Sequence, residues 1–348
     1  MYKGFEFYVG TYTEGESKSE GIYKYRIDAE GQLDSMGLWA ATPNPSFLSL
    51  AGNGPFLLAV NEMANAEGQG TVTAFRITDS SLVATSSVRS GGAHPCYIQT
   101  RGTLVLVANY TGGNIMAARL DEKGVLTEAL STVDFEGSGT HERQESPHAH
   151  SIQFLGATDT ILTADLGTDK IWLHKLEDQK LEPLFDSQSY ISLNSESGPR
   201  HLDRHSNGQI YVLNELSNTI NVLQEASSGR FEITSSHELL RETDTVNSLS
   251  ADIHLSRDER FLYASTRGAN TITAFEVKND GDLFKIATYD LPGDWPRNFA
   301  ITPDNNFIVV AHQNSNDLVS YRRDTNTGEL TLVDQIHAPA PVCIRFSE

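Results

Sequence analysis

Cysteine is scarce in this chain of 348 residues, which contains only Cys96 and Cys343 and no CxxC pair. Two cysteines cannot build the disulfide framework of a small secreted domain. Their scarcity favours a reducing compartment, so we expect a cytoplasmic protein.

Long hydrophobic runs are also missing. No apolar stretch approaches the roughly 18 residues that a membrane-spanning helix needs. The first residues, MYKGFEFYVGTY, lack the basic segment followed by an apolar run that marks a signal peptide. We therefore expect neither a membrane span nor a signal peptide.

Basic residues are in the minority, with 26 Lys and Arg against 46 Asp and Glu and a formal net charge of −20. This balance disfavours nucleic acid and anionic membrane surfaces as partners. An anionic substrate would need a local cluster of basic residues. The GxSxG, P-loop, GxGxxG and HExxH signatures are absent as well.

What the chain does contain is a repeat of about fifty residues, which is the mark of a repetitive fold. Each unit has a short apolar strand that ends in a polar residue, followed by a second alternating strand, and Gly, Asn and Asp fill the turns. The polar strand ends are Thr11, Asn61, Asn109, Asp165, Asn214, Thr266 and His312. A shorter strand, usually headed by proline, precedes each apolar strand.

These units predict an all-β fold with four antiparallel strands in each blade, that is, a seven-bladed β-propeller occupying residues 1–348 as a single domain. Only six heading strands lie inside the chain, and the segment 340–346, APVCIRF, resembles the missing one. We expect this C-terminal strand to join the N-terminal blade and close the ring, which removes its open edge. A closed ring does not need to assemble for stability, so a monomer is plausible.

In a propeller, the start of each heading strand and the end of the next strand lie on the same face, around the mouth of the central channel. The heading positions just after the proline are Ser46, Cys96, His148, Arg200, Ala251, Arg297 and Val342. The strand ends add Glu62, Asn109, Asp165, Glu215, Arg267 and His312. The geometry predicts that these side chains converge.

The pair His148 and His150, in the stretch SPHAHS, is the most informative pattern. Alternate residues of a strand share a face. Aligned on the proline, His148 takes the polar slot near the mouth, whereas His150 takes a slot where the other blades carry apolar residues. Metal binding would need a third ligand such as Asp165 or Glu215, and the neighbouring arginines would repel a cation. We expect no metal.

Structural roles compete with functional ones at several of these positions. Asn and Asp at strand ends are commonly turn formers, which applies to Asn109 and Asp165. Glu215 could serve only to pair with arginine. Arg143, Arg297 and His312 could equally be solvated surface residues.

The segments YVGTYT, NPSFL, ANYTGGNI, ERQESPHAHS, GPRHL, NEL and TRGANTI resemble the seven-bladed propeller lactonases, which include the cycloisomerase-type 6-phosphogluconolactonases. The resemblance covers essentially the whole chain, and residues 143–151 are its most specific part. It implies a cytosolic hydrolase that opens 6-phospho-D-glucono-1,5-lactone without metal or other cofactor, in the pentose phosphate pathway. The family's site residues fall on a histidine of the HAH pair and on Arg200, Glu215 and Arg267.

A hypothetical mechanism follows. His148 acts as general base, oriented or assisted by Glu215, with His150 holding the site in place. Arg200 and Arg267 bind the oxyanion or the phosphate. Arg143, Asn109, Asp165, Arg297 and His312 are further substrate-binding candidates.

Two alternatives remain open. The first is hydrolysis or cycloisomerisation of another sugar lactone or of a carboxylated lactone, as in the related carboxymuconate lactonising enzymes. The second is a non-enzymatic propeller that serves as an interaction module, because a fold does not fix function.

Overall fold

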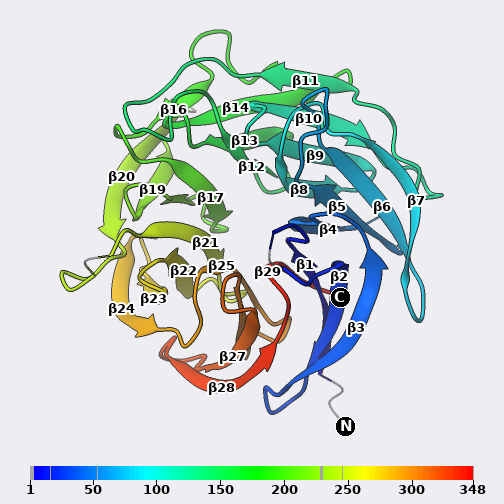
Figure 1. The fold of residues 1–348 in the computed structure, drawn as a ribbon. Helices are drawn as coiled ribbons and strands as arrows, with labels where there is room; N and C mark the ends of the chain where they lie inside the picture. Colours follow the sequence, from blue (N-terminus) through cyan, green and yellow to red (C-terminus); the bar gives the residue numbers. More distant parts are fainter. Residues whose placement is uncertain (1–3, 16, 53, 228–229, 245, 348) are drawn as a thin grey trace.

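The computed structural model describes residues 4–15, 17–52, 54–227, 230–244 and 246–347. In this part of the chain the regular elements are β-strands, and they form seven sheets arranged as a ring (Figure 1). The predicted seven-bladed propeller is confirmed. Within the described residues, no helix is long and apolar enough to cross a membrane.

Each sheet is one blade, described here from the channel outwards. Blades 1 to 3 consist of β29 (Pro341–Phe346), β1 (Phe5–Thr11), β2 (Gly21–Ile27) and β3 (Leu33–Ala41); β4 (Phe47–Ala51), β5 (Phe56–Asn61), β6 (Thr71–Ile77) and β7 (Leu82–Arg89); and β8 (Pro95–Arg101), β9 (Leu104–Asn109), β10 (Asn114–Arg119) and β11 (Ser131–Asp134). Blade 4 consists of β12 (Ala149–Phe154), β13 (Thr160–Asp165), β14 (Lys170–Glu177), β15 (Lys180–Pro183) and β16 (Tyr190–Ser192). Blades 5 to 7 consist of β17 (Pro199–Arg204), β18 (Ile210–Asn214), β19 (Thr219–Glu225) and β20 (Phe231–Glu238); β21 (Leu249–Leu255), β22 (Phe261–Arg267), β23 (Thr271–Val277) and β24 (Leu283–Asp290); and β25 (Pro296–Ile301), β26 (Phe307–His312), β27 (Asp317–Arg323) and β28 (Leu330–His337).

The ring closes as predicted. β29, from the C-terminal end, pairs antiparallel with β1, for example at Val9 and Ile344, so blade 1 is built from both ends of the chain. In Figure 1 the red β29 lies beside the blue β1. This pairing gives the first strand of the chain a partner on each side, which removes an exposed edge.

Blade 4 departs from the predicted four strands. β15 and β16 both pair with β14, β15 along its second half and β16 along its first half. The outer strand of this blade is therefore split into two pieces. The loop between them, residues 184–189, interrupts the pairing.

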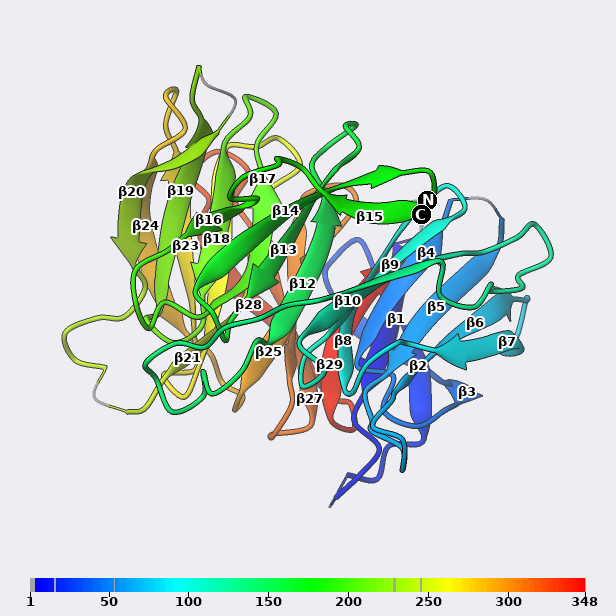
Figure 2. The same ribbon diagram turned by 90° about the horizontal axis from the view of Figure 1, so that it is seen from above.

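The burial of a strand depends on its position within the blade. The second strands, such as β5 and β9, are buried along their whole length, because the flanking blades cover both of their faces. The outer strands, such as β7 and β28, begin with a buried residue and otherwise consist of partly buried and exposed residues. In Figure 2 the strands run between the two faces of the ring, so a blade's strand ends lie at one face or the other.

Candidate active site

The innermost strand of most blades has an irregularity at its start that defines one ring of residues around the channel. In blade 3, Pro95 pairs with Asn109 and Tyr97 pairs with Ala108, so Cys96 is an extra residue between two pairs. Blades 4, 5 and 7 repeat this arrangement at His150, Arg200 and Arg297. An extra residue of this kind redirects a side chain. Ser46, Cys96, His150, Arg200, Arg297 and Val342 all line one recess in the channel.

The predicted register of the SPHAHS strand is therefore wrong. Ala149, and not Pro147, pairs with the strand-end residue Asp165, so His150 takes the slot assigned to His148. Pro147 lies two residues before the position that Pro95, Pro199 and Pro296 occupy in their own blades. A shift of two residues keeps the side chain on the same face but moves it by about 6.6 Å along the strand. His150 thus lines the recess, and His148 lies outside the strand.

The imidazole of His150 is buried, and its ring nitrogens make only long contacts. Nδ1 lies 3.8 Å from Sγ of Cys96, and Nε2 lies 3.9 Å from Oε2 of Glu215. Burial, and then the charge of Arg200, holds the pKa of His150 well below its ordinary 6.5. The ring is therefore neutral at pH 7, and one of its nitrogens can accept a proton from a water molecule.

Glu215 is the centre of a buried cluster of charges. Its Oε2 lies 2.9 Å from Nε of Arg200 and 2.9 Å from Nη2 of Arg267, and its Oε1 accepts a 2.6 Å hydrogen bond from Nη1 of Arg143. Burial by itself would raise the pKa of this carboxyl, but Arg267, Arg200 and Arg143 outweigh it and lower the pKa from 4.5 to about 2. Glu215 is therefore a permanent anion that holds arginines in place, and it is a poor proton acceptor at neutral pH.

Main-chain carbonyls hold the guanidinium groups of Arg200 and Arg267 in place by accepting hydrogen bonds from them. Arg200 donates through Nη1 to the carbonyl of Ala251. Arg267 donates through Nε to Leu249 (3.2 Å) and through Nη2 to Ser250 (3.1 Å). Both guanidinium groups thus have fixed orientations, which is what the stabilisation of a developing negative charge requires.

The loop 135–148, between β11 and β12, brings Arg143 to the mouth from outside the repeat. Arg143 bridges Glu215 and the hydroxyl of Tyr110, to which its Nη2 donates at 3.0 Å. Its side chain is 35% exposed, against 3% for Arg200. The loop is anchored by Gln144, which donates to Leu166 and to Asp169.

His148 belongs to the base of this loop. Its ring stacks on Tyr110 with a centroid distance of 4.5 Å, and its Nδ1 donates to the Tyr110 carbonyl at 3.1 Å. Nε2 lies 3.3 Å from Oε1 of the exposed Glu145. These contacts favour a structural role for His148, and they leave His150 as the histidine of the pair that lines the recess.

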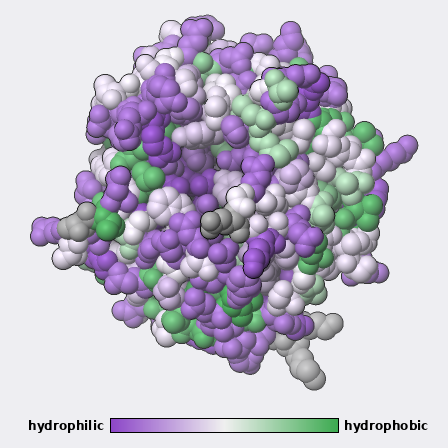
Figure 3. Space-filling model, in the orientation of Figure 1, coloured by the Kyte–Doolittle hydropathy of each residue, from purple (hydrophilic) through white to green (hydrophobic). Residues whose placement is uncertain are grey.

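Arg297 reaches the recess from the opposite side. Its Nη2 donates to the hydroxyl of Tyr12 at 2.7 Å, and that hydroxyl donates to Oε2 of Glu62 at 2.8 Å. Glu62 and Arg297 line the recess together with His150 and Arg200. Figure 3 shows hydrophilic residues gathered around a hollow in the middle of the ring.

A second ring of side chains lies directly below the first. His201 donates through Nδ1 to Oδ1 of Asp252 (2.7 Å), and Asn298 donates to Oδ2 of Asp252 (2.5 Å). The three residues occupy equivalent positions on blades 5, 6 and 7. His201 and Asn298 line both the recess and the wider cavity below it, so they separate the two.

This second ring predicts acid sensitivity. Burial, and then Arg200, lowers the pKa of His201 from 6.5 to about 4. Since the folded-state pKa lies below the unfolded one, the stabilisation is complete above pH 6.5 and is lost as the pH falls towards 4. We expect the protonation of His201 to lower the free energy of unfolding by about 3 kcal/mol between pH 7 and pH 4. Urea unfolding at both pH values measures it, and the His201→Gln variant should lose less stability over this range than the wild type. Equal losses would contradict the prediction.

Three predicted substrate-binding residues lie inside their own blades. Asn109 donates to Ser90 and Asn114, and Asp165 accepts from the amide of His148 and from Thr168. His312 is paired through Nδ1 with Asp317 at 2.7 Å. The side chains of Asn109, Asp165 and His312 are all fully buried. These contacts favour a structural role at the ends of their strands, and the assignment of the three residues to the substrate stays a prediction.

Sequence reasoning missed Tyr12, and it placed Tyr110 and Glu62 at the mouth without assigning either of them a role. Each of the three directly follows a strand-end residue, as Glu215 and Arg267 do. A comparison of this position across the blades would have found them. The unusually long spacing of 56 residues between Asn109 and Asp165 would likewise have pointed to the inserted loop that displaces Pro147.

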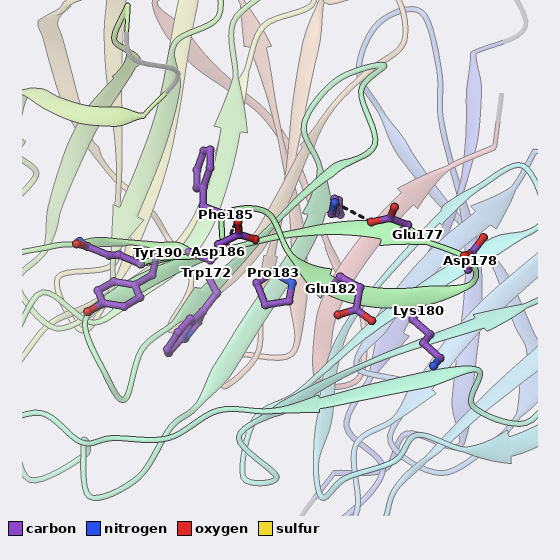
Figure 4. A pocket seen from close by; sticks show the side chains of 12 residues that line it. Trp172, Glu177, Asp178, Lys180, Glu182, Pro183, Phe185, Asp186 and Tyr190 are labelled. Atoms are coloured by element: carbon purple, nitrogen blue, oxygen red, sulfur yellow. Dashed lines mark hydrogen bonds and ion pairs between the residues drawn. The ribbon is translucent and has the colours of Figure 1, made fainter.

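A second hollow lies on the outer strands of blade 4 (Figure 4). Trp172, Phe185 and Tyr190 line it together with lysines and carboxylates, but its lining contains no histidine, cysteine or arginine. It therefore lacks the combination of histidine and arginine that the recess in the channel provides. Among the described residues, no three His, Cys, Asp or Glu side chains gather as a metal-binding group.

Comparison with known proteins agrees with this architecture. A family model described as "Lactonase, 7-bladed beta-propeller" matches residues 6–346. The 6-phosphogluconolactonase of Bacillus subtilis is 34% identical to this chain over 97% of each protein. The crystal structure of a putative 6-phosphogluconolactonase from Bacteroides fragilis superposes with a TM-score of 0.91 at 32% identity, covering 99% of this chain and 98% of that one. The periplasmic gluconolactonase of Pseudomonas aeruginosa has a TM-score of 0.91 at 29% identity and 99% coverage of both chains.

Proposed function

Because this chain belongs to the lactonase family of seven-bladed β-propellers, we propose that it hydrolyses 6-phospho-D-glucono-1,5-lactone to 6-phosphogluconate. The observation that carries the proposal is the recess itself. A neutral histidine lies there beside three guanidinium groups that share one carboxylate, in a chain whose net charge is −20. A local excess of positive charge in an acidic protein suits an anionic substrate.

The first step is attack of water on the lactone carbonyl. His150 takes a proton from the water as its oxygen bonds to the carbonyl carbon, and the carbonyl oxygen becomes an oxyanion. Arg200 and Arg267 stabilise this oxyanion, because their orientations are fixed before the reaction. Glu215, 3.9 Å from Nε2 of His150, stabilises the imidazolium that forms.

In the second step the ring bond between the carbonyl carbon and the ring oxygen breaks. The imidazolium of His150 returns its proton to that oxygen, which becomes a hydroxyl group. The carboxylic acid formed from the carbonyl then gives its own proton to solvent and leaves as the carboxylate. Arg143 is the most exposed of the three arginines around Glu215. We assign it to the phosphate, which projects from the ring towards solvent.

The test compares two substrates. The purified protein should hydrolyse freshly generated 6-phosphogluconolactone with a kcat/KM at least about tenfold higher than for glucono-1,5-lactone, because an arginine–phosphate contact adds binding. Proton release at constant pH measures both rates against spontaneous hydrolysis. No acceleration of either substrate would contradict the proposal.

A second candidate is an unphosphorylated sugar lactone. It is favoured by the similarity to the Pseudomonas aeruginosa protein, whose name is gluconolactonase. This candidate would be favoured if kcat/KM for glucono-1,5-lactone in the same assay were equal to or higher than kcat/KM for 6-phosphogluconolactone.

A further inference from the structure

The recess has two chemically different sides. On one side Arg200 lines the recess and, together with Arg143 and Arg267, surrounds Glu215, with three positive charges against one negative charge. On the other side Arg297 is joined to Glu62 through the hydroxyl of Tyr12. The first side carries an excess of positive charge, whereas the second is balanced.

The balanced side presents both donors and acceptors to the recess. Arg297 contributes guanidinium N–H groups beyond the one that Tyr12 accepts, and Glu62 contributes a carboxylate that is only partly buried. Burial raises the pKa of the Tyr12 hydroxyl, so this group stays protonated and keeps donating to Glu62. The arrangement holds Arg297 and Glu62 at a fixed separation.

Ser46 supplies an independent observation. It heads blade 2, lines the same recess and is 4% exposed. Its Oγ has no hydrogen-bond partner among the described residues. A buried hydroxyl without a partner is costly, and a hydroxyl group of a ligand in the recess would satisfy it.

We propose that Ser46, Glu62 and Arg297, with Tyr12 as their positioning residue, form a subsite for the vicinal hydroxyl groups of a sugar lactone ring. A sugar hydroxyl both donates and accepts, so a neighbouring carboxylate, guanidinium and serine hydroxyl match two adjacent hydroxyls. The carbonyl end of the ring then lies towards His150 and Arg200. The subsite rests on the proposed lactonase function, and it determines specificity for a polyhydroxylated ring over a plain one.

The experiment compares glucono-1,5-lactone with δ-valerolactone, which has the same ring without hydroxyl groups. In Glu62→Gln the ratio of the two kcat/KM values should fall by roughly 10–100-fold, because a hydrogen bond to a charged group is lost. Ser46→Ala should lower the same ratio by a smaller factor. Glu142→Gln, which changes an exposed carboxylate on the 135–148 loop, is the matched control and should leave the ratio at the wild-type value.

A binding measurement separates this subsite from the proposed reaction. The probe is 1,5-anhydro-D-glucitol, a ring with sugar hydroxyls but without a carbonyl group, and its affinity is measured by calorimetry. Wild-type binding that weakens in Glu62→Gln and Ser46→Ala supports the subsite even if the wild-type protein hydrolyses neither lactone, a result that would refute only the proposed function. The subsite would be overturned if both variants kept the wild-type affinity for 1,5-anhydro-D-glucitol and the wild-type ratio of kcat/KM values. A change confined to the preference for the phosphorylated substrate would also overturn the subsite.

Discussion

Replacing His150 with glutamine should lower kcat by about 10²–10⁴-fold with little change in KM, since general-base assistance contributes a factor of this size. Glutamine fills part of the space of the ring but cannot take a proton from water. Initial rates on freshly generated 6-phosphogluconolactone measure the effect. Because the pKa of His150 lies well below 6.5, the wild-type kcat/KM should also persist below pH 6.5 until this base is protonated.

His148→Gln is the matched comparison, two residues away. Its ring is held by stacking on Tyr110 and by the Tyr110 carbonyl, outside the recess. We expect kcat to fall less than about tenfold, through a small displacement of the 135–148 loop. A larger loss of activity in His148→Gln than in His150→Gln would show that His148 is the general base, as the sequence predicts.

Glu215→Gln should lower the unfolding free energy by about 3–5 kcal/mol, because it leaves two buried guanidinium groups without their counter-ion. For a chain of 348 residues this corresponds to a decrease in Tm of roughly 4–7 °C. Turnover should fall as well, because Arg200 and Arg267 lose the carboxylate that holds them near the carbonyl oxygen. Urea and thermal unfolding at pH 7 measure the stability change.

The pH dependence of this deficit identifies its cause. The folded-state pKa of Glu215, about 2, lies below its ordinary 4.5, so its stabilisation is complete above pH 4.5 and is lost as the pH falls through 2. The difference between wild type and Glu215→Gln should therefore shrink below pH 4.5. Glu62→Gln is the control for stability, since Glu62 is only partly buried and its carboxylate accepts a hydrogen bond from the neutral hydroxyl of Tyr12. A deficit of the same size in Glu62→Gln, or one independent of pH, would contradict the explanation by charge.

The repeat can be recognised in the sequence because every blade has the same local structural requirements. Every unit needs an apolar second strand to be covered on both faces, a polar residue at its end to complete the turn, and Gly, Asn or Asp in the hairpins. These demands recur at Asn61, Asn109 and Asn214. Closure by the segment 340–346 followed from counting the units. The number of blades and the face on which the chemistry lies were therefore determined by the sequence.

The sequence by itself did not determine the exact register of the innermost strand in the fourth blade. Proline marks the start of a heading strand only when the loop before it has the usual length, and the loop 135–148 is an insertion that breaks this relation at Pro147. Strand pairing, and not the nearest proline, decides that His150 lies level with Cys96 and Arg200. The same loop brings Arg143 across the mouth to Glu215, a contact between residues 72 positions apart that no local pattern encodes.

Residue identity alone also could not separate the strand-end residues from their neighbours. Asn109, Asp165 and His312 are polar and lie at the correct end of their strands, yet their side chains are buried in turns, whereas Tyr12, Glu62, Glu215 and Arg267 stand one residue later. The sequence by itself determined the propeller, its closure and the polar face of the channel, because these depend on periodic local patterns. Only the tertiary structure decided which side chains meet there, because those contacts join different blades and depend on bulges and an inserted loop.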